Sequence, residues 1–340
     1  SVPGCGDGPM VNEEPLVTVL VCTCDRGELV LGTVQAVLAG GFDSLELLVL
    51  DQSTDERCAR ALQPLCEQDG RVRLIRLGVK GKPLALNHGL SLARGRYVVL
   101  TDDDCEPVSG WLAAHVAAFE AEPQLGCVFG DVDAPAYDPA RGFIPVCRIT
   151  RSETIRGLTA LSIMPGLQHF GIGANMALRR DVLMQLGGWD PWIGPGTKFG
   201  SGDDVDLSVR ILRAGHAIHF CASAKVLHYG FRESAELGEN FARNGFGMGA
   251  IFAKHLKCGA LFRGALRLLA SRLRTAALNA ATGNRPLGAA YPLGWLKGVQ
   301  AGLRHPIVAE RALFAGEPPS CAAHAARVAR VDASQVRRGP

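Results

Sequence analysis

The stretch GKPLALNHGLSLARGRYVVLTDDD, from Gly81 to Asp104, contains the pattern that decides the fold. Its first half has the helix-type spacing of apolar residues, and its second half is a short apolar run typical of a buried strand. The run ends in three adjacent carboxylates, Asp102, Asp103 and Asp104. A helical pattern that leads directly into a buried strand is part of a β-α-β unit, so the stretch predicts a largely parallel sheet.

The same alternation fills the first third of the chain. We expect buried strands at residues 17–23, 45–51, 72–77 and 97–102. Helical patterns separate them, at residues 27–40, 54–68 and 83–95. The sequence therefore predicts an α/β fold with a mostly parallel sheet, right-handed crossovers and helices on its faces.

The pattern changes after Asp131, where a Gly- and Pro-rich middle begins. Further elements are expected there as helices at residues 179–186 and 203–213 and as short strands at 217–222 and 224–230. From about Ser234 onward the periodicity is helical, which predicts a helical C-terminal extension.

The composition is that of an ordinary globular protein, with 47% hydrophobic and 20% charged residues among 340. The 11 cysteines are scattered without zinc-type spacing, so we expect a reduced, cytosolic chain. Residues 254–340 contain 14 lysines and arginines against three acids, although the net charge is only +3. This asymmetry favours an anionic surface or partner near the C-terminal part, and basic residues on solvated helix faces explain it equally well.

We expect no membrane-spanning segment. The longest apolar stretch, residues 157–178, is interrupted by Pro165, His169 and several glycines, and a span needs about 18 apolar residues. Attachment at the inner face of a membrane stays open.

Three adjacent carboxylates at a strand end have two interpretations. They form a solvated turn, or they bind a divalent cation whose charge lets neighbouring carboxylates ionise together. Mg²⁺ or Mn²⁺ takes only one or two protein carboxylates and completes its coordination with substrate phosphates. The second interpretation therefore predicts a site for a nucleotide diphosphate.

A second acidic group, Asp203 and Asp204, follows Gly202 at a predicted helix start. Acids in a first turn complement the helix dipole, and a carboxylate fixed there is also well placed as a general base. His228 follows a predicted strand, either as a structural histidine or as a further ligand of a cation held by Asp104.

The order of these motifs resembles the family 2 glycosyltransferases of GT-A fold, from about Leu16 to about Phe231. The resemblance also includes GANMALRRDVLMQLGGWDP, FGSGDDVDLSVRILRAG and VLHYG, while FARNGFGMGAIFAKHL is similar to the C-terminal helices of bacterial members. Two positions depart from the family pattern. The first strand ends in Thr-Cys-Asp-Arg instead of a Thr-Tyr-Asn-Arg type turn, and Asp203-Asp204 replaces the usual Glu-Asp pair.

The resemblance implies an inverting transfer of a sugar from a nucleotide-diphosphate donor, such as a UDP-sugar, to an acceptor hydroxyl. Asp51 would accept a hydrogen bond from the uracil ring, and Asp102 would hold the ribose. Asp104 and His228 would bind Mn²⁺ or Mg²⁺, and Asp204 would be the base. The implied donor contacts are completed by Thr23, Asp25, Arg26, Lys82, Asn87 and Asp103. The residues implied near the donor sugar and the acceptor are Gly173, Ala174, Asn175, Trp189 and Asp203.

The resemblance also divides the chain. A glycosyltransferase domain is expected at residues 16–232, with a nucleotide-binding half at 16–131 and an acceptor and catalytic half at 132–232. Around it we expect a flexible leader at 1–15, a helical subdomain at 233–316 and a disordered tail at 317–340. The acceptor would be a carbohydrate, a lipid-linked molecule or a small molecule, and nucleic acid is not an expected partner.

A non-catalytic protein that binds a nucleotide-sugar or a glycan on the same scaffold is the alternative from another class. A dehydrogenase has a related fold, but CTCDRGE stands after the first strand where a GxGxxG motif would be required.

Overall fold

The computed structural model describes residues 14–158, 171–260, 263–281 and 289–318. The expected leader and tail lie outside the described residues, apart from two residues of each. Residues 159–170 of the longest apolar stretch lie outside them as well. Among the helices of the described part, none has both the length and the apolar character needed to cross a membrane.

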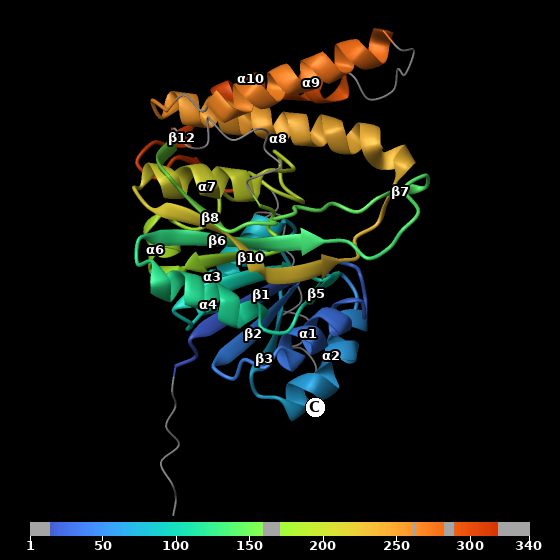
Figure 1. Cartoon of the computed structure of the whole chain (residues 1–340), viewed down its shortest axis with the longest axis vertical. Helices are drawn as coiled ribbons and strands as arrows, with labels where there is room; N and C mark the ends of the chain where they lie inside the picture. Colours follow the sequence, from blue (N-terminus) through green and yellow to red (C-terminus); the bar gives the residue numbers. More distant parts are fainter. Residues whose placement is uncertain (1–13, 159–170, 261–262, 282–288, 319–340) are drawn as a thin grey trace, which may run out of the picture.

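A nine-stranded sheet forms the centre of the molecule, in the order β3-β2-β1-β4-β9-β6-β10-β5, with β8 also paired to β10 (Figure 1). Its first four strands are parallel, as the sequence predicts, and β9 lies antiparallel between β4 and β6. The strands are β1 (Val17–Thr23), β2 (Leu45–Asp51), β3 (Val72–Arg76), β4 (Tyr97–Asp102), β5 (Cys105–Pro107), β6 (Leu125–Asp133), β8 (Glu153–Arg156), β9 (Met176–Arg179) and β10 (Ala217–His228).

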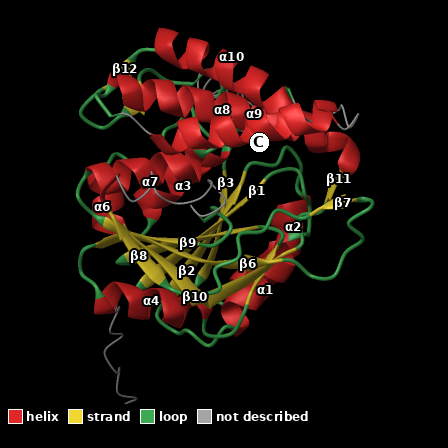
Figure 2. Ribbon diagram, turned by 45° about the horizontal axis from the view of Figure 1, so that its top comes forward, coloured by secondary structure: helices red, strands yellow, loops and turns green. Residues whose placement is uncertain are grey.

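Helices cover both faces of the sheet, and a further helical layer lies outside one of them (Figure 2). The helices on the sheet are α1 (Val30–Ala39), α2 (Arg57–Gln68), α3 (Lys82–Leu92), α4 (Trp111–Ala121), α6 (Arg180–Gln185) and α7 (Asp203–Arg213). The outer layer contains α8 (Leu237–Lys257), α9 (Arg263–Ala281) and α10 (Ala290–Arg304). Short pairs join β7 (Gly142–Phe143) to β11 (Arg232–Glu233) and β12 (Ile307–Val308) to β13 (Leu313–Phe314).

The sequence prediction was wrong about the two short strands near residue 220, which form one continuous strand, β10. A register shift between Cys221 and Lys225 bends this strand. Its first half pairs with β8 and its second half with β5, while both halves pair with β6. The irregularity that suggested two strands is thus a bulge within one.

Side chains alternate between the two faces of the sheet along each strand, so each face has its own hydrophobic core. Val17, Val19 and Val21 of β1 pack with α1, α2 and α4, whereas Leu20 packs on the opposite face with α3 and α7. The thiol of Cys127 is free and fully buried among apolar side chains.

The outer layer is held by close contact between α8 and α10. A Cβ added at Gly249 of α8 would lie 2.0 Å from the carbonyl oxygen of Trp295, and one at Gly298 of α10 would lie 2.0 Å from that of Phe246. The two backbones therefore touch where glycines face the partner helix, as in small-residue helix pairs.

The carboxyl ends of the parallel strands meet at one edge of the sheet. Thr23 is in register with Asp51, and Cys22 with Asp102, so the last residues of β1, β2 and β4 are neighbours. Ligands bind beyond this edge in open α/β sheets, and the polar residues predicted as a site lie there.

Candidate active site

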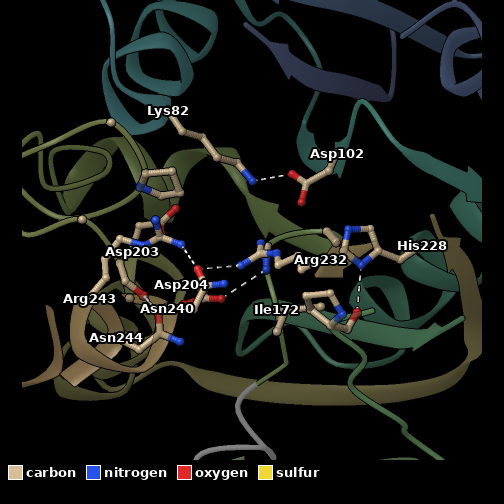
Figure 3. A pocket seen from close by; sticks show the side chains of 18 of the residues that line it. Lys82, Asp102, Ile172, Asp203, Asp204, His228, Arg232, Asn240, Arg243 and Asn244 are labelled. Carbon is tan, nitrogen blue, oxygen red and sulfur yellow. Dashed lines mark hydrogen bonds and ion pairs between the residues drawn. The ribbon is translucent and has the colours of Figure 1, made fainter. Parts of the chain in front are cut away.

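A cavity of about 410 Å³ opens at this edge of the sheet (Figure 3). Three parts of the chain form its walls: the ends of the strands, the loop that precedes α7, and the first half of α8. Its lining residues are Lys82, Asp102, Phe143, Pro145, Ile172, Gly173, Ala174, Pro195, Gly196, Gly200, Ser201, Gly202, Asp203, Asp204, His228, Arg232, Asn240, Arg243 and Asn244.

Asp104 and His228 meet although they are far apart in the sequence. His228 Nε2 lies 3.2 Å from Asp104 Oδ1, and His228 Nδ1 lies 2.8 Å from the carbonyl oxygen of Pro145. In the neutral tautomer that donates from Nδ1 to Pro145, the lone pair of Nε2 therefore faces a carboxylate. Asp104 Oδ1 is buried and has no hydrogen-bond partner among the described residues.

The charges around Asp104 keep it ionised. Burial opposes ionisation, but the neighbouring His228 and Arg26 lower the pKa of Asp104 below its ordinary value. Burial also opposes protonation of His228, yet its contacts with Asp104 and Pro145 raise the pKa of the imidazole. Arg26 Nη1 bridges Asp103 Oδ1 at 2.8 Å and Asp104 Oδ2 at 2.5 Å, so a cation already neutralises the crowded carboxylates.

These residues fit a divalent cation. Ligand atoms of Asp104, Cys105 and His228 lie within 4.8 Å of one another. A Cβ added at Gly230 would lie 2.7 Å from His228 Nε2 and 2.8 Å from Asp104 Oδ2, so a glycine leaves the space beside both ligands open. Burial raises the pKa of Cys105, which keeps its thiol protonated and leaves oxygen and imidazole as ligands suited to Mn²⁺ or Mg²⁺.

Lys82 and Asp102 form an ion pair on the cavity wall. Burial opposes the charge on Lys82, but the carboxylates of Asp102 and Asp203 raise its pKa. A Cβ added at Gly173 would lie 3.7 Å from Lys82 Nζ, so the ammonium group faces the segment that includes Gly173 and Ala174.

Asp203 and Asp204 begin α7 and both line the cavity. Asp204 Oδ2 accepts a hydrogen bond from the backbone N–H of Gly173 at 3.2 Å, and its Oδ1 accepts from the N–H of Val205 at 2.8 Å. Burial and the adjacent charge of Asp204 raise the pKa of Asp203 to about 7, and burial raises the pKa of Asp204. Gly202, at φ 92°, has the left-handed conformation that turns the chain into this helix.

The residues predicted for the base pocket lie together at the ends of β1 and β2, beside the cavity. Thr23 donates to Asp103 Oδ2 at 2.6 Å, and Asp25 pairs with Lys80 at 2.5 Å. Asp51 is fully buried; its Oδ1 accepts from the N–H of Ser53, whereas its Oδ2 has no hydrogen-bond partner in the described part of the chain.

The predicted site residues that do not line the cavity are Thr23, Asp25, Arg26, Asp51, Asn87, Asp103, Asp104, Asn175 and Trp189. Asn175 is fully buried, and its side chain bonds to Trp111 Nε1 at 2.7 Å and to two backbone carbonyls. Asn87 exchanges two hydrogen bonds of 2.8 Å with the backbone of Trp189, whose side chain is buried. In this structure the polar groups of these two asparagines bind the protein itself.

Sequence reasoning missed five polar residues of the cavity: Ser201, Arg232, Asn240, Arg243 and Asn244. Three of them lie on one side of α8, at spacings of three and four residues. Their spacing on one helix face was a signal, but the sequence did not show that this face borders the strand ends.

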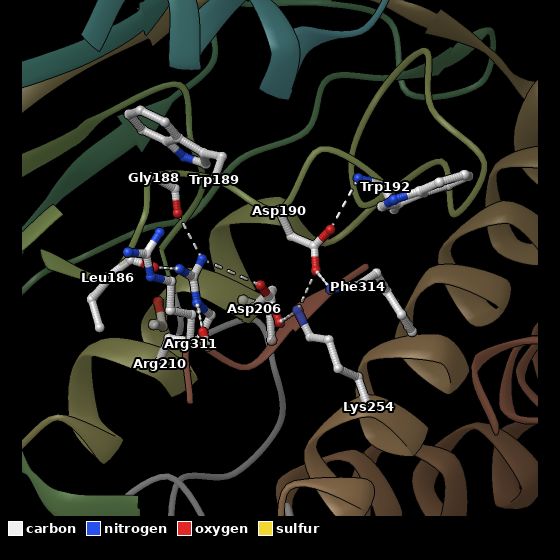
Figure 4. Close-up of polar contacts among 12 residues, drawn as sticks. Leu186, Gly188, Trp189, Asp190, Trp192, Asp206, Arg210, Lys254, Arg311 and Phe314 are labelled. Carbon is white, nitrogen blue, oxygen red and sulfur yellow. Dashed lines mark hydrogen bonds and ion pairs between the residues drawn. The ribbon is translucent and has the colours of Figure 1, made fainter. Parts of the chain in front are cut away.

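A buried ion-pair network connects α7 to α8 behind the cavity (Figure 4). Lys254 Nζ lies 2.7 Å from Asp190 Oδ2 and 2.6 Å from Asp206 Oδ1, and all three side chains are at most 1% exposed. His255 Nε2 lies 2.9 Å from the same oxygen of Asp206. Asp206 is two residues beyond Asp204, so the network fixes the helix that carries both cavity aspartates.

Comparison with known proteins gives concordant results. Residues 18–187 match the family model described as Glycosyl transferase family 2. The chain is 26% identical over 231 residues to the glucosyl-dolichyl phosphate glucuronosyltransferase of Haloferax volcanii, covering 65% of this chain and 71% of that protein. It is 23% identical over 226 residues to a probable glycosyltransferase of Bacillus subtilis, covering 63% of this chain and 50% of that protein.

A solved structure shares the fold. The mannosyltransferase from Pyrobaculum calidifontis, in complex with GDP-Man and Mn²⁺, superposes with a TM-score of 0.55 at 21% identity, covering 86% of each chain. At this identity the likeness identifies the fold alone, which is GT-A.

Proposed function

The chain belongs to glycosyltransferase family 2, and from that premise we propose that it transfers a sugar from a UDP-sugar to an acceptor hydroxyl with inversion at the anomeric carbon. The observation that carries this proposal is the cavity in which Asp102, His228 and Asp204 face the same space, with Asp104 against His228. Since the chain is a glycosyltransferase, the alternative of a binding protein without turnover is set aside.

The donor is proposed to lie along the strand ends. Asp51 Oδ2 has no hydrogen-bond partner among the described residues and lies 3.8 Å from Arg76 Nε, which supports a contact with a ring N–H of uracil, with Thr23 and Asp25 beside it. Because Asp51 is fully buried, neighbouring side chains must move before a base contacts it. Asp102 would hold the ribose, and Lys82 and Arg26 would place positive charge near the diphosphate.

Asp104 and His228 are the proposed ligands of Mn²⁺ or Mg²⁺. When bound, the cation would act as a Lewis acid that offsets the charge that develops on the departing diphosphate. Asp103, which accepts from Thr23 and pairs with Arg26, is proposed to orient the donor site without binding the cation.

Asp204 is the proposed general base. The N–H groups of Gly173 and Val205 hold its carboxylate in a fixed orientation on the cavity wall. There it would remove the proton of the acceptor hydroxyl as the oxygen attacks the anomeric carbon opposite the leaving UDP. Burial raises the pKa of Asp204, and burial with the charge of Asp204 raises the pKa of Asp203, so the pair favours this transfer near neutral pH.

Contact with an anionic membrane surface is proposed for α9 and α10. Neither helix contains an acid, and both expose leucines beside basic residues such as Arg267, Lys297 and Arg304. The exposed fractions are 39% for Leu266, 50% for Leu273, 61% for Leu278, 55% for Leu293, 59% for Leu296 and 49% for Leu303. Such a surface suits headgroups and upper acyl chains, and the name of the Haloferax relative includes a lipid-linked sugar, glucosyl-dolichyl phosphate.

A screen of UDP- and GDP-sugars for nucleotide release tests the proposal. Release is expected only with Mn²⁺ or Mg²⁺, fastest with one UDP-sugar, and Asp104→Ala should abolish it without lowering the unfolding temperature. Glu28→Ala is the matched control, since this exposed acid lies two residues from Arg26 and makes no ion pair with a described residue. Full activity in excess chelator would disprove the metal assignment, and a preference for GDP-sugars would disprove the donor assignment.

A further inference from the structure

Two arginines are held side by side on the cavity wall. Arg232 Nη1 donates to Asn240 Oδ1 at 3.5 Å, and Arg243 Nη2 donates to the same oxygen. Neither guanidinium forms an ion pair with any carboxylate of the described residues. One neutral carbonyl therefore joins two like charges, and the carboxylates that act favourably on Arg232, those of Asp104, Asp102 and Glu236, do so from beyond ion-pair distance.

The positions of both arginines are fixed by their surroundings. The backbone of Arg232 is paired with Phe143, and a Cβ added at Gly142 would lie 2.0 Å from the Arg232 carbonyl oxygen. The stem of Arg243 crosses Gly200, where an added Cβ would lie 2.9 Å from its Cγ. Glycines thus make room for the backbone of Arg232 and for the side chain of Arg243 at this wall.

Electrostatics opposes this arrangement in the isolated chain. Burial and the positive charge of Arg243 lower the pKa of Arg232, and the more distant carboxylates of Asp104, Asp102 and Glu236 only partly offset this effect. The two guanidiniums are thus crowded like charges, as are the carboxylates of Asp103 and Asp104, which Arg26 neutralises. An anion is the ligand that would neutralise the arginines.

Arg243 lies on the side of the cavity where the proposed base is found, and Arg232 lies beside it toward the middle of the cavity (Figure 3). Figure 3 shows Arg243, Asn240 and Asn244 grouped with Asp203 and Asp204, with Lys82, Asp102 and His228 at the opposite side and Arg232 between the groups. Asn244 also accepts from Ser201 Oγ at 2.8 Å, which ties α8 to the loop before Asp203. The donor diphosphate is expected at the metal, and the acceptor beside the base.

We propose that Arg232 and Arg243 form an anion subsite that binds a phosphate group of the acceptor, so that the acceptor is a phosphorylated or phosphate-linked molecule. This inference rests on the proposed roles of Asp104 and Asp204, which assign the two ends of the cavity. A phosphate carries up to two charges and several acceptor oxygens, and it therefore matches two guanidiniums better than a single carboxylate does.

Direct binding of butyl phosphate tests the subsite, because this monoester has neither nucleotide nor sugar. Titration calorimetry should show binding to the wild-type chain and at least tenfold weaker binding to Arg232→Gln and Arg243→Gln. Pentanoate, which carries the same butyl chain on a carboxylate of single charge, should bind at least tenfold more weakly than butyl phosphate. Arg60→Gln, at an exposed arginine on α2, is the matched control and should bind both as the wild type does.

A second binding experiment distinguishes a subsite for the acceptor phosphate from one for the donor diphosphate. Binding of UDP and GDP with Mn²⁺ should change less than threefold in both variants. If nucleotide binding weakens tenfold while butyl phosphate binding does not change, the arginines bind the donor and the proposal is wrong. Unchanged butyl phosphate binding in both variants also overturns it.

The variants should fold normally, since removing one of two like charges relieves repulsion, and their unfolding temperatures should equal or exceed that of the wild type. Neither binding experiment requires sugar transfer. A failure of the proposed function, with no metal-dependent nucleotide release, is therefore distinguishable from a failure of the subsite.

Discussion

The surroundings of Asp203 and Asp204 change the pKa of both carboxyl groups. Both acids are in the first turn of α7, where the helix dipole favours negative charge. Burial acts against that charge, and each carboxylate opposes ionisation of the other. The result is a pair of carboxyl groups whose last proton is released near neutral pH instead of near pH 4.

Substitution of this pair by asparagine separates the two residues. Asp204→Asn should lower kcat by about 10²–10⁴-fold with little change in donor affinity, because a general base acts in the transition state. Asp203→Asn should retain most activity, and the acid limb in its pH profile of kcat should lie no higher than that of the wild type, because Asp204 then ionises beside a neutral amide. Steady-state kinetics with saturating metal provides the measurement. Equal and mild effects at both positions would mean that the acids only cap the helix.

Stability provides an independent check on the same pair. An acid whose pKa is raised on folding destabilises the fold as pH rises from its unfolded pKa, about 4, to its folded pKa. For Asp203 that window ends near pH 7. The unfolding temperature of Asp203→Asn should therefore exceed that of the wild type at pH 8 and match it at pH 4. A lower unfolding temperature at pH 8 would contradict the assigned cause of the shift.

At the scale of elements, the position of α7 depends on α8 through the buried Lys254. Lys254→Met leaves the carboxylates of Asp190 and Asp206 without their shared cation, and loss of one partner from a buried pair costs about 3–5 kcal/mol. We expect this loss in the free energy of unfolding by urea denaturation, together with a fall in kcat because Asp204 shares the helix. The control is Lys297→Met, at an exposed lysine on α10, which should change stability by less than about 0.5 kcal/mol. Equal stabilities of the two variants would show that the network does not hold α7.

Two glycine substitutions in α8 test the close contact between α8 and α10. Gly249→Ala would bring a methyl group to 2.0 Å from the Trp295 carbonyl oxygen, so the helices must separate, and we expect destabilisation of at least about 1–3 kcal/mol. Gly238→Ala is the matched change on α8, at a position where an added Cβ meets nothing within 4 Å. There alanine should stabilise the protein by up to about 1 kcal/mol, through helix propensity. Thermal unfolding of both variants measures the difference, and the same sign of effect in both would refute the close contact.

At the scale of the whole molecule, the basic helices α9 and α10 form an outer layer next to the side of the sheet that contains α3 and α7 (Figure 2). Co-sedimentation should show binding to phosphatidylcholine vesicles that contain phosphatidylglycerol, weaker binding at higher salt, and little binding to phosphatidylcholine alone. Leu293→Gln with Leu296→Gln should reduce binding several-fold, whereas Leu29→Gln, at a leucine of similar exposure near α1, should not. Indifference to both kinds of vesicle would leave only solvated helix faces.

Local patterns in the sequence determined the strands β1 to β4, the helices between them, and the start of α7 at Asp203, because periodicity and helix-start signals act over a few residues. The carboxyl ends of adjacent parallel strands also meet at one edge, so Asp51 and Asp102 could be assigned to one side of the sheet from the sequence.

Only the tertiary structure decided which distant residues share the cavity. It paired β9 antiparallel between β4 and β6, joined Asp104 to His228, and buried the side chains of Asn175 and Trp189 in contacts with the protein. It also brought Arg232 and the first half of α8 to the strand ends. Helical periodicity predicts that α8 has an apolar face, but it does not predict what that face contacts. The contacts depend on glycines that pack against α10 and on the ion pairs of Lys254. Both involve residues far apart in the sequence, so no local pattern encodes them.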